Sequence, residues 1–177
     1  EFRRVLFRSL ERESSRAEIL LDKGISLIAL SRFEEALAAF DAVAKDTPGP
    51  SVLVNRASAL IGLKRYEDAL ADSDAAIAGD KNSAEAWHNR ASALAGLRRF
   101  ADAIQAFDKA LTLRPGSAAG WINRGNVLMS LTRYDEAITA YAKAITLDAT
   151  YVYAYFNTGL CWIMKGEYEE ALIWLQK

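Results

Sequence analysis

The feature that most constrains this chain is a pattern that returns every 33 or 34 residues. The stretch from Ala84 to Ser117 holds one complete copy, and a shift of 34 residues places Trp87 on Trp121. Alanine marks the same place in every copy, at intervals of 33, 34, 34 and 34 residues: Ala36, Ala69, Ala103, Ala137 and Ala171. A fixed period of this size indicates stacked supersecondary units in place of one globular core. The sequence therefore predicts five such units.

Each unit is expected to contain two helices. In the first unit, apolar residues recur at the helical spacings of three, four and seven between Ile19 and Leu30. Glu34 and Glu35 then open a second helix, because the helix dipole favours negative charge in the first turn. Two rows are predicted to form the core, namely the alanines above and an aromatic row: Phe33, Tyr66, Phe100, Tyr134 and Tyr168.

The arrangement resembles the tetratricopeptide repeat, a family with Trp, Leu-Gly, Tyr, Ala, Phe, Ala and Pro at fixed offsets. The third unit carries the matching residues: Trp87, Ala91, Leu94, Ala103, Phe107, Ala110 and Pro115. The resemblance covers roughly residues 17 to 177 and implies an all-α, right-handed solenoid of about five helical hairpins. After a lead-in at 10–16, the repeats are expected at 17–49, 50–83, 84–117, 118–151 and 152–177. The last repeat is expected to be incomplete, because it stops inside its second helix.

Residues Glu1 to Ser9 differ from the rest of the chain. They are basic, carry no repeat offset and begin without methionine. They look like the in-frame translation of a sequencing-library adapter, so we interpret residues 1–9 as a non-native stretch. Arg8 interrupts the apolar run after only Val5 to Phe7, which is too short for the core of a signal peptide.

Composition and charge narrow the classes of partner. The formal net charge is -1 and the isoelectric point is about 6.0, so no basic surface for nucleic acid or anionic lipid is expected. Charged residues interrupt every hydrophobic stretch well before the roughly 20 residues needed to span a bilayer. We therefore expect a soluble, cytoplasmic protein that binds neither nucleic acid nor membrane. The sequence leaves the oligomeric state open.

The sequence contains few residue patterns that could support catalysis. It shows no metal-ligand cluster, no glycine-rich phosphate loop and no nucleophile with a base at helical spacing. The single cysteine, Cys161, is expected to pack as a small hydrophobic residue, and the single histidine, His88, lies two repeats away. We expect this fragment not to be an enzyme and to hold no cofactor or metal.

A row of asparagines is the strongest signal outside the expected core. It occupies one place on the first helix of four consecutive repeats: Asn55, Asn89, Asn123 and Asn157. In one interpretation, each amide bonds a neighbouring helix terminus or turn and so sets the stacking. In the other, first helices line a concave groove, and the amides bind the backbone of an extended peptide. The row resembles the asparagine ladder of the glycosyltransferases that attach N-acetylglucosamine to protein Ser and Thr, although Asp22 takes this place in the first unit.

Other side chains are expected on the same groove. They form one set beside the asparagines and one set a turn later: Val54, His88, Ile122 and Phe156, then Ser58, Ser92 and Asn126. His88 is interpreted as an ordinary groove histidine. Some members of the family bind the acidic C-terminus of chaperones through a carboxylate clamp. That function is disfavoured here, because the clamp's lysine position never holds lysine: Leu21, Val54, His88, Ile122 and Phe156.

Two functions follow from the resemblance. The first is a protein-interaction scaffold that binds an extended peptide or a partner helix in its concave groove. The alternative is a substrate-recruiting arm of a larger enzyme, such as a protein glycosyltransferase, whose catalytic domain would lie beyond Lys177.

Acidic and basic residues covary between consecutive repeats. An acid in the second helix of one repeat is matched by a base in the first helix of the next, in three pairs: Asp41 with Arg56, Asp74 with Arg90, and Asp108 with Arg124. Where the acid becomes Ala142, the base becomes Thr158. Because a buried guanidinium needs a carboxylate partner, we predict buried arginines with each carboxylate within about 4 Å.

Overall fold

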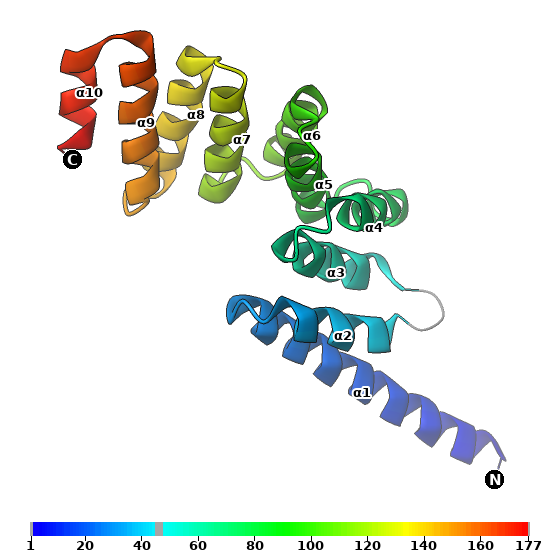
Figure 1. Cartoon of the computed structure of the whole chain (residues 1–177). Coiled ribbons are helices and arrows are strands. Elements are labelled where there is room, and N and C mark those ends of the chain that lie inside the picture. Colours follow the sequence, from blue (N-terminus) through cyan, green and yellow to red (C-terminus); the bar gives the residue numbers. More distant parts are fainter. Residues whose placement is uncertain (1, 45–47, 177) are drawn as a thin grey trace. The chain divides into compact units, whose positions relative to one another are not determined.

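The computed structural model describes residues 2–44 and 48–176, with side chains from Arg16 onward. These residues form ten helices and no strand (Figure 1). The helices follow one another as α1 Phe2–Ala29, α2 Phe33–Val43, α3 Pro50–Gly62, α4 Tyr66–Gly79, α5 Ala84–Gly96, α6 Phe100–Leu113, α7 Ala118–Ser130, α8 Tyr134–Leu147, α9 Val152–Lys165 and α10 Tyr168–Leu175. The helices α3, α5, α7 and α9 begin at residues 50, 84, 118 and 152, where the sequence places the starts of repeats two to five.

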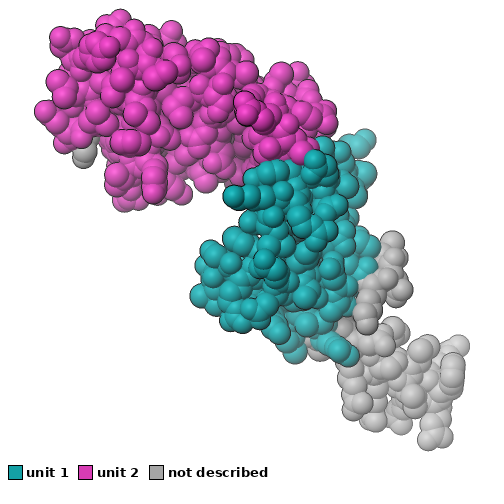
Figure 2. Space-filling view, viewed as in Figure 1, with its two compact units in different colours: residues 1–81 teal, residues 82–177 magenta. Residues whose placement is uncertain are grey.

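The helices form antiparallel hairpins within two compact units, residues 1–81 and 82–177 (Figure 2). In the first unit, α1 pairs with α2, α3 pairs with α4, and α2 packs on α3. The second unit continues the same order from α5 to α10. First helices also touch within each unit, α1 with α3 and α5 with α7. Contacts limited to near neighbours in the chain are typical of a linear repeat array.

A residue in the left-handed backbone conformation stands in the turn of every hairpin. Four of these residues are not glycine, and all five have φ between 57° and 83°: Ser31, Lys64, Arg98, Thr132 and Gly166. The turn geometry therefore repeats although the turn residues differ. Helix starts also use local signals, since Pro50 opens α3 and the hydroxyl oxygens of Ser83 and Ser117 cap α5 and α7.

The alanine row is buried as predicted, with at most 2% of any member exposed. The aromatic row is less buried than predicted: Phe33, Tyr66, Phe100 and Tyr134 are intermediate, and Tyr168 is 62% exposed. Each of these aromatics is the first residue of a second helix, at the end of its hairpin. The fully buried rings instead stand four residues after a row alanine and share its inward face: Phe40, Phe107 and Tyr141.

The helix α1 begins at Phe2, so the stretch predicted to be non-native and the lead-in at 10–16 continue directly into the first repeat. The side chains of Glu1 to Ser9 lie outside the described residues, so the interpretation of this stretch as non-native stays a prediction.

Candidate functional site

Side-chain hydrogen bonds link the first helices of the second unit. The Asn123 side-chain amide nitrogen on α7 lies 3.3 Å from Nε2 of His88 on α5. The Asn157 amide on α9 donates to Oδ1 of Asn126 on α7, at 3.0 Å. The helices α5, α7 and α9 therefore carry one shared polar face, on which two of the four row asparagines lie.

Asn126 is fixed from two sides. Its Oδ1 accepts a second hydrogen bond from the hydroxyl of Tyr141 on α8, at 2.8 Å. The Tyr141 side chain is fully buried, and this burial raises the pKa of its phenol well above the ordinary value. Tyr141 therefore stays protonated and continues to donate, which holds Asn126 in place to receive Asn157.

The other two asparagines of the row differ from Asn123 and Asn157. Asn89 is only 8% exposed, so it is closed to a ligand in this structure. Asn55, in the first unit, is partly exposed and donates to the carbonyl of Ser51 in its own helix, at 3.0 Å. The repeated sequence position therefore does not give four equivalent amides.

The predicted groove residues beside the asparagine row also differ in how exposed they are. Phe156 is 49% exposed and lies with Val152 and Tyr153 among the exposed apolar residues of α9. Ile122 is only 8% exposed, because this apolar side chain packs inward while the polar Asn123 beside it stays partly exposed. The remaining groove residues are partly buried: Val54, Ser58, His88, Ser92 and Asn126. The hydroxyl of Ser58 donates to the carbonyl of Val54, at 3.1 Å.

His88 lies where the polar face meets the core. Its ring packs edge-on against Phe107, with ring centroids 5.3 Å apart. Burial lowers its pKa, the charge of Arg114 lowers it further, and Glu85 opposes the shift. Arg114 and Glu85 also form an ion pair with each other. The neutral imidazole is therefore the form that the folded state favours.

Acidification is expected to destabilise the second unit through His88. The pKa of a histidine in the unfolded chain is about 6.5. If its pKa in the folded chain is lower, the histidine stabilises the fold at pH values above about 6.5. This contribution is lost as the pH falls through the folded pKa. We expect the free energy of unfolding to fall as the pH drops below about 6.5, and less so in His88→Gln. Because the chain has one histidine, its imidazole resonances in an NMR titration report the pKa directly, and a pKa at or above about 6.5 would contradict this expectation.

Two of the predicted ion pairs lie within a unit, and the structure brings both together. Arg124 Nε lies 2.7 Å from Asp108 Oδ1, and Arg56 Nη1 lies 3.2 Å from Asp41 Oδ1. The arginines are largely buried, but 53% of the Asp41 side chain and 52% of the Asp108 side chain are exposed. The third pair, Asp74 with Arg90, would join residues of different units and stays a prediction.

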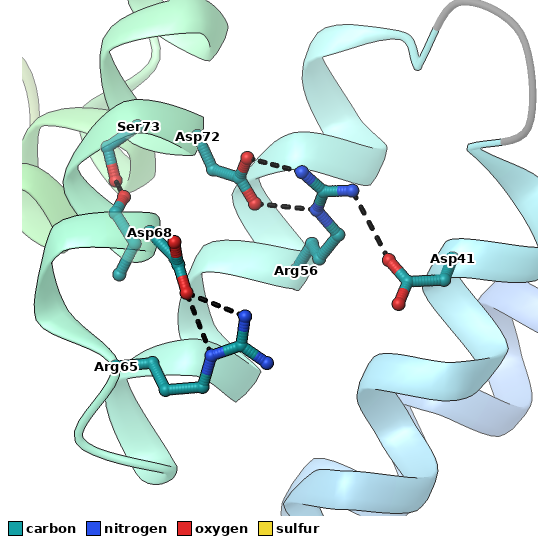
Figure 3. Close-up of polar contacts among 7 residues, drawn as sticks. Asp41, Arg56, Arg65, Asp68, Asp72 and Ser73 are labelled. Carbon is teal, nitrogen blue, oxygen red and sulfur yellow. Dashed lines mark hydrogen bonds and ion pairs between the residues drawn. The ribbon is translucent and has the colours of Figure 1, made fainter.

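Arg56 has a stronger partner, which the sequence reasoning missed. Its Nε and Nη2 donate to the two carboxylate oxygens of Asp72 on α4, at 2.7 and 2.6 Å (Figure 3). Only 8% of the Asp72 side chain is exposed. The hydrogen bonds to Asp72 raise the pKa of Arg56, against the opposing effect of burial. A comparison of the repeats could have pointed to Asp72, because the equivalent position is alanine in the first, third and fourth repeats: Ala39, Ala106 and Ala140.

The thiol of Cys161 is fully buried, and burial raises its pKa to about 11. At neutral pH it packs as a hydrophobic group, since only the thiolate is strongly nucleophilic. In the part of the chain that the structure describes, no three His, Cys, Asp or Glu side chains come together as a metal site. None of the described helices is long and apolar enough to cross a membrane.

Comparisons with known proteins agree with this architecture. Family profiles described as tetratricopeptide repeat match residues 3–52, 21–84 and 84–117, and one described as TPR repeat matches 125–161. No curated protein sequence matches the chain significantly.

Among solved structures, a crystal structure of MamA is 27% identical, with a TM-score of 0.75 over 86% of this chain and 90% of that one. A second structure of a MamA protein is 26% identical, with a TM-score of 0.76 over 92% and 90%. The thermophilic TPR protein TTC0263 of Thermus thermophilus is 22% identical, with a TM-score of 0.78 over 89% and 87%. The chain is therefore an all-α solenoid built of tetratricopeptide repeats.

Proposed function

We propose that this chain is a protein-interaction scaffold that binds an extended peptide along the first helices of its second unit. The tetratricopeptide fold and the MamA structures support the scaffold function. The observation that carries the peptide site is the pair of cross-helix hydrogen bonds, Asn123 with His88 and Asn157 with Asn126. They align polar groups of three successive repeats on one face.

The amide orientations define which peptide groups this face would bind. The nitrogens of Asn123 and Asn157 are used inside the protein. Within residues 2–44 and 48–176, their carbonyl oxygens make no hydrogen bond, and both side chains are partly exposed. The face therefore offers acceptors on two successive first helices. An extended peptide has backbone N–H groups that point outward at regular intervals, which suits such a row.

Apolar contacts would add to these hydrogen bonds. Phe156 stands next to Asn157 in the sequence, and it is exposed together with Tyr153 on the same helix. Aromatic side chains supply large contact areas at low cost in conformational entropy. We therefore expect the bound peptide to place an apolar side chain near Phe156.

The stacking interpretation of the asparagine row remains compatible with this site. The same amides that would offer oxygen to a peptide use their nitrogen to join neighbouring helices. The alternative of a substrate-recruiting arm of a larger enzyme stays a prediction.

The double variant Asn123→Ala/Asn157→Ala is expected to weaken peptide binding at least about tenfold, because two hydrogen bonds of about 1 kcal/mol each would be lost. A peptide selected from a displayed random library and labelled with a fluorophore serves as the probe, with affinity measured by anisotropy. The control is Thr139→Ala on α8, an exposed second-helix position whose hydroxyl bonds only its own helix. Equal affinities of the double variant and the control would refute the site, and melting temperatures show whether either variant has unfolded.

A further inference from the structure

Asp72 interrupts a row of small buried residues. The equivalent residues of the first, third and fourth repeats are Ala39, Ala106 and Ala140, all of them buried, and the fifth repeat has Trp174 there. A carboxylate at such a place needs a partner, and Arg56 provides it through two short hydrogen bonds. The second repeat therefore has a buried ion pair where the first, third and fourth repeats have alanine.

This pair lines a cavity of about 310 Å³ between α2, α3 and α4, all in the first unit. That volume lies at the lower end of the range for small-ligand sites, roughly 300–1,000 Å³. Leu37, Leu60 and Ala71 supply an apolar part of the lining. The remaining residues are charged and come from all three helices and from the turn before α4: Asp41, Arg56, Arg65, Asp68 and Asp72.

The charges of this lining do not balance. Three carboxylates face two guanidinium groups, which leaves one negative charge in excess. Asp72 engages two nitrogens of Arg56 at 2.6 and 2.7 Å, so Asp41 is left with one longer contact of 3.2 Å (Figure 3). Arg65 contacts a single oxygen of Asp68 through two nitrogens, with Nε at 2.8 Å and Nη2 at 2.6 Å.

Asp41 and Asp68 retain acceptor capacity at the edge of the cavity. Both side chains are about half exposed. Each uses one carboxylate oxygen for its arginine, and within the described residues the other oxygen makes no hydrogen bond. An ionised carboxylate can accept about four hydrogen bonds, so both can accept more.

The equivalent surface of the second unit lacks this excess charge. Asp108 and Glu136 there face Arg124 and Arg133, and Ala140 stands in the place of Asp72. Two acids and two bases balance. The second unit therefore provides a control that has the same fold and the same kinds of ion pair.

We infer that the cavity between α2, α3 and α4 binds an arginine side chain of a partner protein. The methylene stem would pack on Leu37, Leu60 and Ala71, as long basic side chains commonly pack on apolar surface. The guanidinium would donate to the open oxygens of Asp41 and Asp68. Arginine fits better than lysine because its weakly hydrated, planar head offers five donors in different directions. The site shares no residue with the proposed peptide face, so each can fail without the other.

The test uses N-acetyl-arginine amide as the probe and the citrulline analogue, which is neutral and nearly isosteric, as its control. The methyl resonances of Leu37 and Leu60 are followed by NMR during titration of the full chain. We expect saturable shifts with a dissociation constant of about 1 mM for the arginine probe, and none for citrulline. Asp41→Asn/Asp68→Asn should weaken binding at least about fivefold, whereas Asp108→Asn/Glu136→Gln should leave it unchanged. The amide oxygens of Asn and Gln can still accept hydrogen bonds from the arginines, so both double variants should fold.

Equal binding of citrulline, absence of saturation, or undiminished binding by Asp41→Asn/Asp68→Asn would overturn the inference. If free arginine bound but N-acetyl-arginine amide did not, the cavity would be a site for a free amino acid. That result would also contradict the inference that it binds an arginine of a partner protein. A melting temperature for each variant separates loss of the site from loss of the fold.

Discussion

Replacing Tyr141 by alanine is expected to lower the free energy of unfolding of its repeats by about 3–5 kcal/mol. The Tyr141 side chain is fully buried, and its ring lies against Gly125 of the preceding helix. A side-chain Cβ at Gly125 would stand 2.6 Å from a ring carbon of Tyr141, so the two residues fit each other closely. Because Gly125 has no side chain to fill the space, the cavity left by alanine should stay largely open.

Tyr141→Phe separates the ring from the hydroxyl. This variant removes only the hydrogen bond to Asn126, which still receives one from Asn157. We expect a cost of about 1 kcal/mol. Urea unfolding of the full chain measures the change in free energy of unfolding for both variants. Hydrogen exchange at amides of α7 and α8 is measured as well, because repeat arrays need not unfold in two states. A loss below about 1.5 kcal/mol for Tyr141→Ala would contradict the expectation.

The repeat made the fold predictable from sequence. A single period placed Ala36 and its four equivalents, and all of them are buried. The period alone could not show that the rings at another place, those of Phe40, Phe107 and Tyr141, would be the fully buried ones. Phe33 begins its helix at the end of the hairpin, whereas Phe40 lies one turn beyond Ala36 on the inward face. Which row fills the core depends on the angle between paired helices, and that angle emerges only from packing.

The candidate site was less predictable. The sequence marks the row that includes Asn89 and Asn123, but it does not show that Asn89 is buried while Asn123 reaches His88. Equal spacing in a solenoid gives equivalent backbone positions, whereas exposure depends on the neighbouring side chains. The sequence also places Asn126 on this face, but the hydrogen bonds by which it joins Tyr141 to Asn157 are visible only once three helices are placed together.

The ion pairs were also predictable only in part. The covariation between repeats indicated Asp41 as the partner of Arg56, and the two are in contact. It could not indicate Asp72, because covariation needs an equivalent pair in another repeat, and none of the other repeats has an acid there. A unique residue in an otherwise uniform row is a signal of its own.

Replacing Asp72 by alanine is expected to cost about 3 kcal/mol, because it leaves the largely buried guanidinium of Arg56 with only one longer contact, to Asp41. The double variant Arg56→Leu/Asp72→Ala should recover to within about 1 kcal/mol of the natural chain, since a well-packed apolar pair often replaces a buried ion pair without loss. Asp108→Ala is the matched control. The Asp108 carboxylate is half exposed whereas that of Asp72 is buried, so Asp108→Ala should cost less than Asp72→Ala, although it also leaves a largely buried guanidinium, that of Arg124. Urea unfolding of Asp72→Ala, Arg56→Leu and the double variant completes a double-mutant cycle. A cost for Asp72→Ala no greater than that for Asp108→Ala would show that the buried carboxylate does not stabilise the second repeat.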